Sequence, residues 1–448
     1  MERTVLRNIQ KSTELFHENS NYTPDGVSSP MRAFRQVGSN PISLSAGKGS
    51  LVFDIDGNEY VDFLSSFGAC LLGHAHPKVI EKITMQAQKG TVLGLTSPLE
   101  HLLAEKIVKS TSALEQIRFV CSGTEAVMTT VRIAKAHTGR EKIVKFIGSY
   151  HGHSDVLLAT PATCGLKTKG VTKGISEYLG KDILLCEYND KEHLTALFNQ
   201  FGSEIAAVIV EPYATNMGFV AAKDGFLHKI RELCTSYKSL FIFDEVVTGF
   251  RFNFGGVCNL MDIDPDLITF GKIIGGGLPI GAYGGKAKYM SHVKIGGDVF
   301  QSGTFAGNPM TMAAGLAALE IMEQDNFYEE LEEKGKTLKT SIENEFAKHN
   351  LPFIFTHYKG LGGIAFRNDT ESMSNYADVK TQRYDIYSKT HQKLLDKGYL
   401  LAPSLEEPIF INAAHTHEQL IGLAKAIADS IHEVFYEEEE RINYAPAM

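Results

Sequence analysis

The sequence has no apolar run of the roughly 20 residues that a membrane-spanning helix needs, and it has no excess of positive charge. Its formal net charge is −9 at pH 7, which opposes binding to nucleic acid or to an anionic membrane surface. Residues 1–22 are polar and lack the apolar core of a signal peptide, so we expect neither a signal peptide nor a transit peptide. We therefore expect no nucleic-acid partner and no membrane partner.

Cysteine is scarce and irregularly placed. His151 and His153 are two positions apart and cannot share one face of a helix, as a pair of helical metal ligands would. We predict no metal site, and we expect a reducing, cytoplasmic location. The cysteines show no C-x-x-C spacing, so neither a zinc site nor a disulfide framework is predicted for Cys70, Cys121, Cys164, Cys186, Cys234 and Cys258.

The chain does contain enough apolar sequence for a large core, since 43% of its 448 residues are hydrophobic. A chain of this length usually divides into two or more lobes. Between residues 67 and 324, helical patterns alternate with short apolar runs, which is typical of an α/β domain with a mostly parallel sheet covered on both faces. We expect strands at 116–120, 143–146, 182–186, 206–210, 240–243 and 281–284.

The two ends of the chain have a less regular, α+β pattern. We expect residues 1–66 and 325–448 to form a smaller domain beside the large domain of residues 67–324. The D-G-N turn at 56–58 predicts a hairpin within 48–63, and the T-H-E-Q sequence at 416–419 predicts a capping box that starts the last helix. We expect helices at 3–18, 326–349, 377–397 and 416–436, and strands near 353–357, 362–367, 399–401 and 409–412.

Lys272 is the first candidate for chemistry. It follows an apolar run and precedes three glycines at 275–277, so it lies at a crowded backbone site rather than on a solvated helix face. A desolvated lysine loses its proton more readily and becomes a nucleophilic amine, the form that makes a Schiff base with an aldehyde cofactor. A lysine on a glycine-rich surface turn is the alternative interpretation.

Asp244 is the second candidate. It ends the apolar run 240–243, which is typical of a buried parallel strand, and open α/β sheets bind ligands at the carboxyl ends of such strands. Pyridoxal phosphate needs a carboxylate against its pyridinium nitrogen, because the protonated ring is the electron sink. Alternatively, Asp244 and Glu245 only cap the next helix.

A phosphate site is the third candidate. An apolar strand ends at Cys121 and leads through Ser122, Gly123 and Thr124 into a helical pattern. This arrangement places hydroxyl and free backbone N–H groups at a helix N-terminus, where phosphate binds readily. A Ser-Gly-Thr turn alone is more often an ordinary N-cap.

These three stretches and several others resemble the class-III pyridoxal-phosphate aminotransferases, over nearly the whole chain. The resemblance is greatest to the aminomutase branch that converts glutamate-1-semialdehyde into 5-aminolevulinate. It implies fold-type I architecture, pyridoxal 5'-phosphate as the cofactor, and a homodimer with shared active sites. The segments that carry it are VCSGTEA (120–126), SYHGH (149–153), IVEP (209–212), FDEVVTGFR (243–251), GKIIGGGLPIGAYGGK (271–286) and SGTFAGNP (302–309).

The resemblance also assigns roles to residues. Lys272 would bond covalently to the cofactor and then move protons, and Asp244 would hold the ring nitrogen protonated. Tyr150 and Val246 would contact the ring, although a buried core tyrosine is an equal alternative for Tyr150. The remaining implied contacts are Ser122, Gly123 and Thr124 to the phosphate, Asn216 to the ring oxygen, Thr304 to the phosphate in the neighbouring subunit, and Ser29, Arg32, Thr163 and Glu407 to the substrate.

The substrate pocket departs from the aminomutase pattern. The family usually has tryptophan at the position of Phe67 and an aromatic residue at that of Glu406, and its mobile lid differs from residues 159–176. An aminomutase must retain its intermediate behind a closed lid, whereas a transaminase must release its first product. We therefore keep three interpretations: an aminomutase first, a transaminase of a β- or ω-amino acid second, and an amino-acid racemase or epimerase third. A non-enzymatic protein would be expected to lack Lys272 or Asp244.

Overall fold

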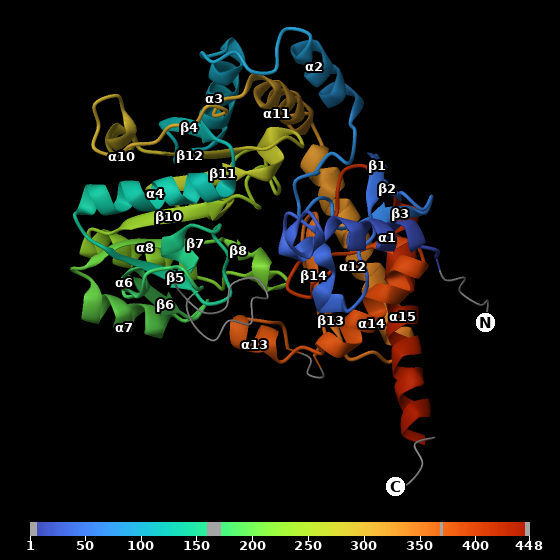
Figure 1. The fold of residues 1–448 in the computed structure, drawn as a ribbon. Helices are drawn as coiled ribbons and strands as arrows, with labels where there is room; N and C mark the ends of the chain where they lie inside the picture. The colour runs from blue at the N-terminus through green and yellow to red at the C-terminus, as the bar shows by residue number, and fades with distance from the viewer. Residues whose placement is uncertain (1–6, 159–171, 368–370, 444–448) are drawn as a thin grey trace.

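The computed structural model describes residues 7–158, 172–367 and 371–443, and its centre is a seven-stranded sheet with the strand order β4-β12-β11-β10-β7-β5-β6. This sheet occupies one side of the molecule in Figure 1. The six strands expected from the sequence are all present, and their ends differ from the expected ends by at most two residues. The seventh strand of this sheet, β11, was not predicted. The bounds are β4 (Gln116–Val120), β5 (Lys142–Phe146), β6 (Ile183–Cys186), β7 (Ile205–Val210), β10 (Leu240–Glu245), β11 (Leu267–Gly271) and β12 (Gly281–Gly285).

The sheet is parallel except at β12, which is antiparallel to both β11 and β4. Only residues 272–280 connect β11 to β12, and a parallel pair would need a crossover of a dozen or more residues. Because the connection is this short, β12 runs antiparallel to β11. The prediction of a mostly parallel sheet is confirmed, and the connection that breaks the pattern is the one that contains Lys272.

Helices cover this sheet, and its central strands are buried on both faces. All residues of β7, β10 and β11 are buried, which explains why these segments are almost continuously apolar. Helix α4 (Gly123–Thr138) packs over β7, β10, β11 and β12, and α8 (Phe226–Tyr237) packs on β7 and β10. In the part of the chain that the structure describes, no helix combines the length and the apolar character needed to cross a bilayer.

Segments from both ends of the chain join in a second sheet, with the order β1-β2-β3-β15. Strand β15 from the C-terminal part pairs in parallel with β3 from the N-terminal part. The turn at 56–58 joins β2 to β3, as the sequence predicts. Figure 1 shows these strands beside α14 and α15, on the side where both termini lie. The bounds are β1 (Leu44–Lys48), β2 (Leu51–Asp54), β3 (Glu59–Asp62) and β15 (Tyr399–Leu400). A third sheet has the order β13-β14-β16, with the bounds β13 (Ile354–Tyr358), β14 (Leu361–Ala365) and β16 (Ile409–Phe410).

Two helix predictions at the chain ends were wrong in their bounds. Residues 3–6 of the helix expected at 3–18 lie outside the described residues, and residues 7–9 are not helical, so α1 spans Gln10–Asn19. The helix begins there because the Asp56 carboxylate accepts the N–H groups of Lys11 and Ser12 at 2.7 and 2.9 Å. The helix expected at 377–397 is two helices, α13 (Tyr376–Lys380) and α14 (Tyr384–Asp396). The break occurs because Gln382 and Arg383 hydrogen-bond to the backbone of Phe366.

The last helix was predicted correctly at its start. Helix α15 (His417–Asn443) begins after Thr416, whose hydroxyl accepts the N–H of Gln419 while the Gln419 side chain accepts the N–H of Thr416. It extends beyond the expected end near 436. The remaining helices and short strands are α2 (Pro77–Ala87), α3 (Pro98–Ser110), α5 (Asp155–Leu158), α6 (Glu177–Gly180), α7 (Lys191–Phe201), β8 (Tyr213–Ala214), β9 (Val220–Ala221), α9 (Val257–Met261), α10 (Ala287–Met290), α11 (Pro309–Met322) and α12 (Phe327–Lys348).

Candidate active site

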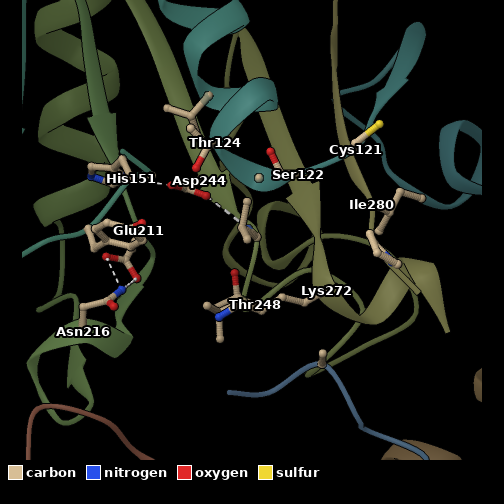
Figure 2. Close-up of a pocket in the computed structure, with 18 of the residues that line it drawn as sticks. Cys121, Ser122, Thr124, His151, Glu211, Asn216, Asp244, Thr248, Lys272 and Ile280 are labelled. Atoms are coloured by element: carbon tan, nitrogen blue, oxygen red, sulfur yellow. Dashed lines mark hydrogen bonds and ion pairs between the residues drawn. The ribbon is translucent and has the colours of Figure 1, made fainter. Parts of the chain in front are cut away.

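A cavity of about 440 Å³ lies where β4, β10 and β11 end, the place where open α/β sheets bind ligands. Figure 2 shows side chains from these strands, from the start of α4 and from the segment after β7 around one open space. The structure brings together eight residues predicted from the sequence, which line this cavity: Ser122, Gly123, Thr124, Tyr150, Asn216, Asp244, Val246 and Lys272.

Asp244 is held firmly at the end of β10. Its side chain is buried, and one carboxylate oxygen lies 2.6 Å from His151 Nδ1. The other oxygen accepts hydrogen bonds from the Thr269 hydroxyl at 3.0 Å and from the Val246 N–H at 3.1 Å. Three partners therefore fix the direction of a carboxylate that faces the cavity.

His151 is a site residue that sequence reasoning missed. From the sequence it was considered only as a metal ligand, whereas in the structure it lines the cavity and its Nδ1 atom lies 2.6 Å from an oxygen of Asp244. Its Nε2 atom is buried and has no hydrogen-bond partner among the described residues. The position of His151, five residues after β5, was the available signal, since strand ends in such sheets converge.

Lys272 begins the tight turn that joins β11 to β12. Its φ angle is 47°, in the left-handed region that non-glycine residues seldom adopt. Burial lowers its pKa, the Glu407 carboxylate opposes that shift, and the Arg251 guanidinium adds to it. A lowered pKa increases the neutral, nucleophilic fraction of the amine.

Glu407 shows the reciprocal effect. Burial raises its pKa to about 7, and the positive charge of Lys272 works against that shift. Glu407 lies in the segment between β15 and β16 and is not among the residues that line the 440 Å³ cavity. The lysine at the end of β11 and an acid from the far end of the chain therefore act on each other's charge.

The predicted phosphate contacts lie at one end of the cavity, where the start of α4 packs closely against Val246. Ser122 is the N-cap of α4, and its hydroxyl accepts the Glu125 N–H at 3.2 Å. A Cβ atom at Gly123 would lie 3.0 Å from Val246 Cγ1, so a larger residue would fit only if the Val246 side chain moved. The N–H groups of Gly123 and Thr124, the first two residues of the helix, have no partners within the helix and are available to an anion.

Glu211 is a second residue that the sequence analysis did not assign. It follows β7 and is buried, and it accepts hydrogen bonds from the Thr215 hydroxyl at 2.9 Å and from Asn216 Nδ2 at 3.2 Å. Burial raises its pKa to about 6, while His151 opposes the shift. Figure 2 shows Glu211 joined to Asn216 by dashed lines, on the same side of the site as His151. Glu211 therefore orients the amide predicted to bond the ring oxygen.

Other predicted residues lie away from this cavity. Thr304 and Arg32 are exposed and Ser29 is half-buried, and none of them is among the residues that line it. Thr163 lies outside the described residues. The roles of all four, like that of Glu407 toward the substrate, stay predictions.

Comparison with known proteins identifies the family. The class-III aminotransferase family matches residues 34–427. The chain belongs to the class-III aminotransferases. The glutamate-1-semialdehyde 2,1-aminomutase of Syntrophomonas wolfei is 43% identical over 431 residues, which cover 96% of this chain and 99% of the relative. The same-named protein of Sulfurihydrogenibium azorense is 44% identical over 415 residues, 92% of this chain and 96% of the relative.

A solved structure shows the same fold. The ω-transaminase from Sphaerobacter thermophilus superposes with a TM-score of 0.86 at 29% sequence identity, covering 95% of this chain and 98% of the transaminase. As a class-III aminotransferase of fold-type I, the protein is an enzyme whose cofactor is pyridoxal phosphate.

The residues present fit this cofactor. A phosphate needs the free N–H groups at the start of α4, a pyridinium needs the fixed carboxylate of Asp244, and an aldehyde needs the amine of Lys272. All three groups border the one cavity. The buried Nε2 atom of His151 has no hydrogen-bond partner among the described residues, as expected if a polar group of a bound molecule supplies that partner.

Proposed function

We propose that this enzyme is a glutamate-1-semialdehyde 2,1-aminomutase, which moves the amino group of its substrate to give 5-aminolevulinate for tetrapyrrole synthesis. The main support for this proposal is the 43% sequence identity with the Syntrophomonas wolfei aminomutase, because the match extends over 99% of that protein. The convergence of Lys272, Asp244 and the α4 N-terminus supports the proposal, since amino-group transfer requires each of these groups.

Each residue has a proposed task. Bound pyridoxal phosphate supplies an electron sink for the carbanion formed at the amine-bearing carbon. Asp244 holds a proton on the ring nitrogen, and His151 and Thr269 hold Asp244 in place. Lys272 Nζ takes a proton from one substrate carbon and returns it at another, which suits a lysine with a lowered pKa. Arg32 binds the substrate carboxylate through its planar fork of donors.

The decisive experiment supplies the cofactor-loaded enzyme with glutamate-1-semialdehyde alone, without an amino donor or a 2-oxo acid. We expect sustained formation of 5-aminolevulinate that Lys272→Ala abolishes. If product appears only when a separate donor and acceptor are added, the aminomutase assignment is wrong.

That second outcome would indicate an intermolecular transaminase acting on a β- or ω-amino acid. One feature of the chain favours it. Glu406, at a position where the aminomutases usually have an aromatic residue, is buried and accepts hydrogen bonds from the hydroxyls of Tyr376 at 3.2 Å and Tyr384 at 2.9 Å. An acidic group next to Glu407 changes the charge near the outer end of the substrate pocket.

We also propose a homodimer with shared active sites. Thr304, predicted to bind the cofactor phosphate of the neighbouring subunit, is exposed. It lies in a segment rich in exposed apolar side chains, and Asn308 ties this segment to Thr91 through a 2.9 Å hydrogen bond. Such a concentration of apolar surface is typical of an interface. The exposed apolar residues of the two joined segments are Val92, Leu93, Leu95, Ile295, Phe300 and Phe305.

Subunit complementation tests this proposal. Lys272→Ala and Thr304→Asp are each expected to be inactive alone, the second because a carboxylate repels the phosphate. A mixed dimer would contain one site with an intact Lys272 and an intact Thr304, so co-expression should restore activity. A mixture that forms dimers without regaining activity would contradict the shared site. A cytoplasmic location remains a proposal that rests on the scattered cysteines of the sequence.

A further inference from the structure

A second cavity adjoins the cofactor cavity. Its volume is about 320 Å³, and it shares Ala69, Gly277 and Leu278 with the first. Cys70, His74 and His76 are among its lining residues, and Cys70 is partly exposed. None of these three side chains has a task in the chemistry proposed above.

His74 is held as a cation beside Cys70. Its Nε2 lies 2.6 Å from an oxygen of the buried Asp62, whose other oxygen accepts the N–H groups of Leu64 and Ser65 at 2.9 and 3.0 Å. The hydrogen bond to Asp62, and a second one to the Cys70 thiol, raise the pKa of His74 to about 10. The imidazole is therefore protonated at neutral pH. The three side chains form a carboxylate–imidazole–thiol series, the arrangement that activates nucleophilic thiols.

Arg251 does not line this cavity, but it is a buried cation close enough to Cys70 for their charges to interact. Its side chain is 1% exposed, and its Nε and Nη2 atoms donate to the carbonyl oxygens of Val247 and Gly68. Its Nη1 atom has no partner, and among the described residues no carboxylate lies within ion-pair distance. Burial lowers the pKa of Arg251 to about 10, and the anion-forming groups of Cys70 and Tyr328 oppose that shift.

The backbone around Cys70 is unusually constrained. Ser65, Ser66, Phe67 and Gly68 have consecutive φ angles of 44°, 52°, 54° and 88°. A run of left-handed residues persists only where surrounding contacts fix it, and such runs are concentrated at functional sites. Here it places the Ser66 hydroxyl 3.4 Å from the Cys70 sulfur and the Gly68 carbonyl against Arg251.

We propose that Cys70 is a reactive nucleophilic thiol and that its cavity binds small anionic electrophiles. Reactive cysteines are partly exposed and lie in electropositive surroundings, and both conditions hold here. The Arg251 and His74 cations would attract an anionic reagent and stabilise the sulfur anion that attacks it. This proposal is independent of which amino-group transfer the enzyme catalyses.

The reaction with iodoacetate is a suitable probe. The Cys70 sulfur forms a bond to the methylene carbon, the carbon–iodine bond breaks, and iodide leaves with the bonding electron pair. The thiol proton passes to the buffer. Iodoacetamide reacts in the same way but has no charge, so the two reagents separate charge attraction from simple access.

The first experiment uses the cofactor-loaded wild-type enzyme and follows each cysteine by peptide mass spectrometry. We expect the ratio of the iodoacetate rate to the iodoacetamide rate at Cys70 to exceed the same ratio for N-acetylcysteine by about tenfold. A ratio equal to that of N-acetylcysteine, or no labelling of Cys70, would overturn the proposal. This measurement needs no variant and so does not depend on whether a variant folds.

The second experiment compares His74→Asn with His76→Asn. Both histidines line the cavity, but burial lowers the pKa of His76, so that ring is neutral and its loss removes no charge. We expect His74→Asn to slow the labelling of Cys70 by iodoacetate about tenfold, and His76→Asn to leave the rate unchanged. Equal rates in the two variants would show that exposure alone governs Cys70, which contradicts the proposal.

Discussion

The floor and the rim of the cofactor cavity are built in different ways. The floor consists of Ser122, Asp244 and Lys272, each at the end of a strand of the large sheet or at the helix start that follows. By the rim we mean Arg32 and Glu407, two predicted substrate contacts that do not line this cavity and that come from segments near the two ends of the chain. A sheet fixes the relative positions of its strand ends, so the floor follows from the fold of one region. The rim depends on the assembly of segments far apart in the sequence.

The two regions also treat charge differently. Asp244 in the floor has three hydrogen-bond partners that fix its carboxylate. Glu407 at the rim is balanced mainly by Lys272 and has a pKa raised to about 7 by burial. We expect floor residues to determine the chemical step, and rim residues to determine which substrate binds and at what pH.

The largest effect should come from Lys272→Ala. Without the amine, the enzyme loses both its covalent bond to the cofactor and its proton carrier, so kcat should fall by more than about 10⁴-fold. Borohydride reduction followed by peptide mass spectrometry should no longer attach the cofactor to the 271–286 segment. Lys286→Ala is the matched control, because Lys286 pairs with the exposed Asp264 at 2.8 Å and should be dispensable.

Asp244→Asn should have the next largest effect. An amide cannot hold a proton on the ring nitrogen, so kcat should fall by about 10²- to 10³-fold while the substrate KM changes little. Steady-state kinetics and the absorbance of the bound cofactor would measure both consequences. Near-normal turnover would show that Asp244 does not stabilise the ring, and the control Asp264→Asn should keep full activity.

The contrast between floor and rim explains what the sequence could predict. Ser122 and Asp244 each lie at the end of a strand that the sequence predicts, so their convergence could be expected from strand ends. Lys272 follows β11, which the sequence did not predict as a strand, and its candidacy came from the apolar run before it and the glycines after it. The hydrogen bond from His151 to Asp244 and the pair of Glu211 with Asn216 join different segments, and no local pattern specifies them.

The same reason accounts for the errors in secondary structure. Helix α1 begins at Gln10 because of Asp56, which is 45 residues from Lys11 in the sequence. The helix expected at 377–397 breaks where Arg383 bonds to Phe366. Helix periodicity is a local signal, and these bounds are set by contacts made only in the folded chain.

Arg32→Ala tests the rim. If Arg32 binds the substrate carboxylate, its loss should raise KM about tenfold to hundredfold and leave the absorbance of the bound cofactor unchanged. Arg35→Ala is the matched control, since Arg35 lies three residues away and pairs with Asp25 at the surface. An unchanged KM for Arg32→Ala would mean that another residue binds the substrate carboxylate. A changed cofactor absorbance would mean that Arg32 also affects the cofactor, which contradicts the division of roles between floor and rim.

Glu407→Gln should give the smallest effect, visible mainly as a shift along the pH axis. As the pH rises through about 7, Glu407 becomes a carboxylate, and that charge raises the pKa of Lys272 by stabilising its ammonium form. Glutamine removes the charge at every pH, so the Lys272 pKa should fall further and the neutral amine should be available at lower pH. We would follow the absorbance change when the cofactor-free enzyme binds pyridoxal phosphate covalently, as a function of pH.

The expected result is a rate profile displaced to lower pH in Glu407→Gln, with a similar plateau at high pH where the amine is neutral in both proteins. Glu406→Gln is the matched control, because Glu406 acts on Glu407 but is not among the groups that shift the Lys272 pKa. A displacement to higher pH would mean that Glu407 does not stabilise the ammonium. Equal displacement in both variants would assign the effect to the charge of the whole rim rather than to the pairing of Glu407 with Lys272.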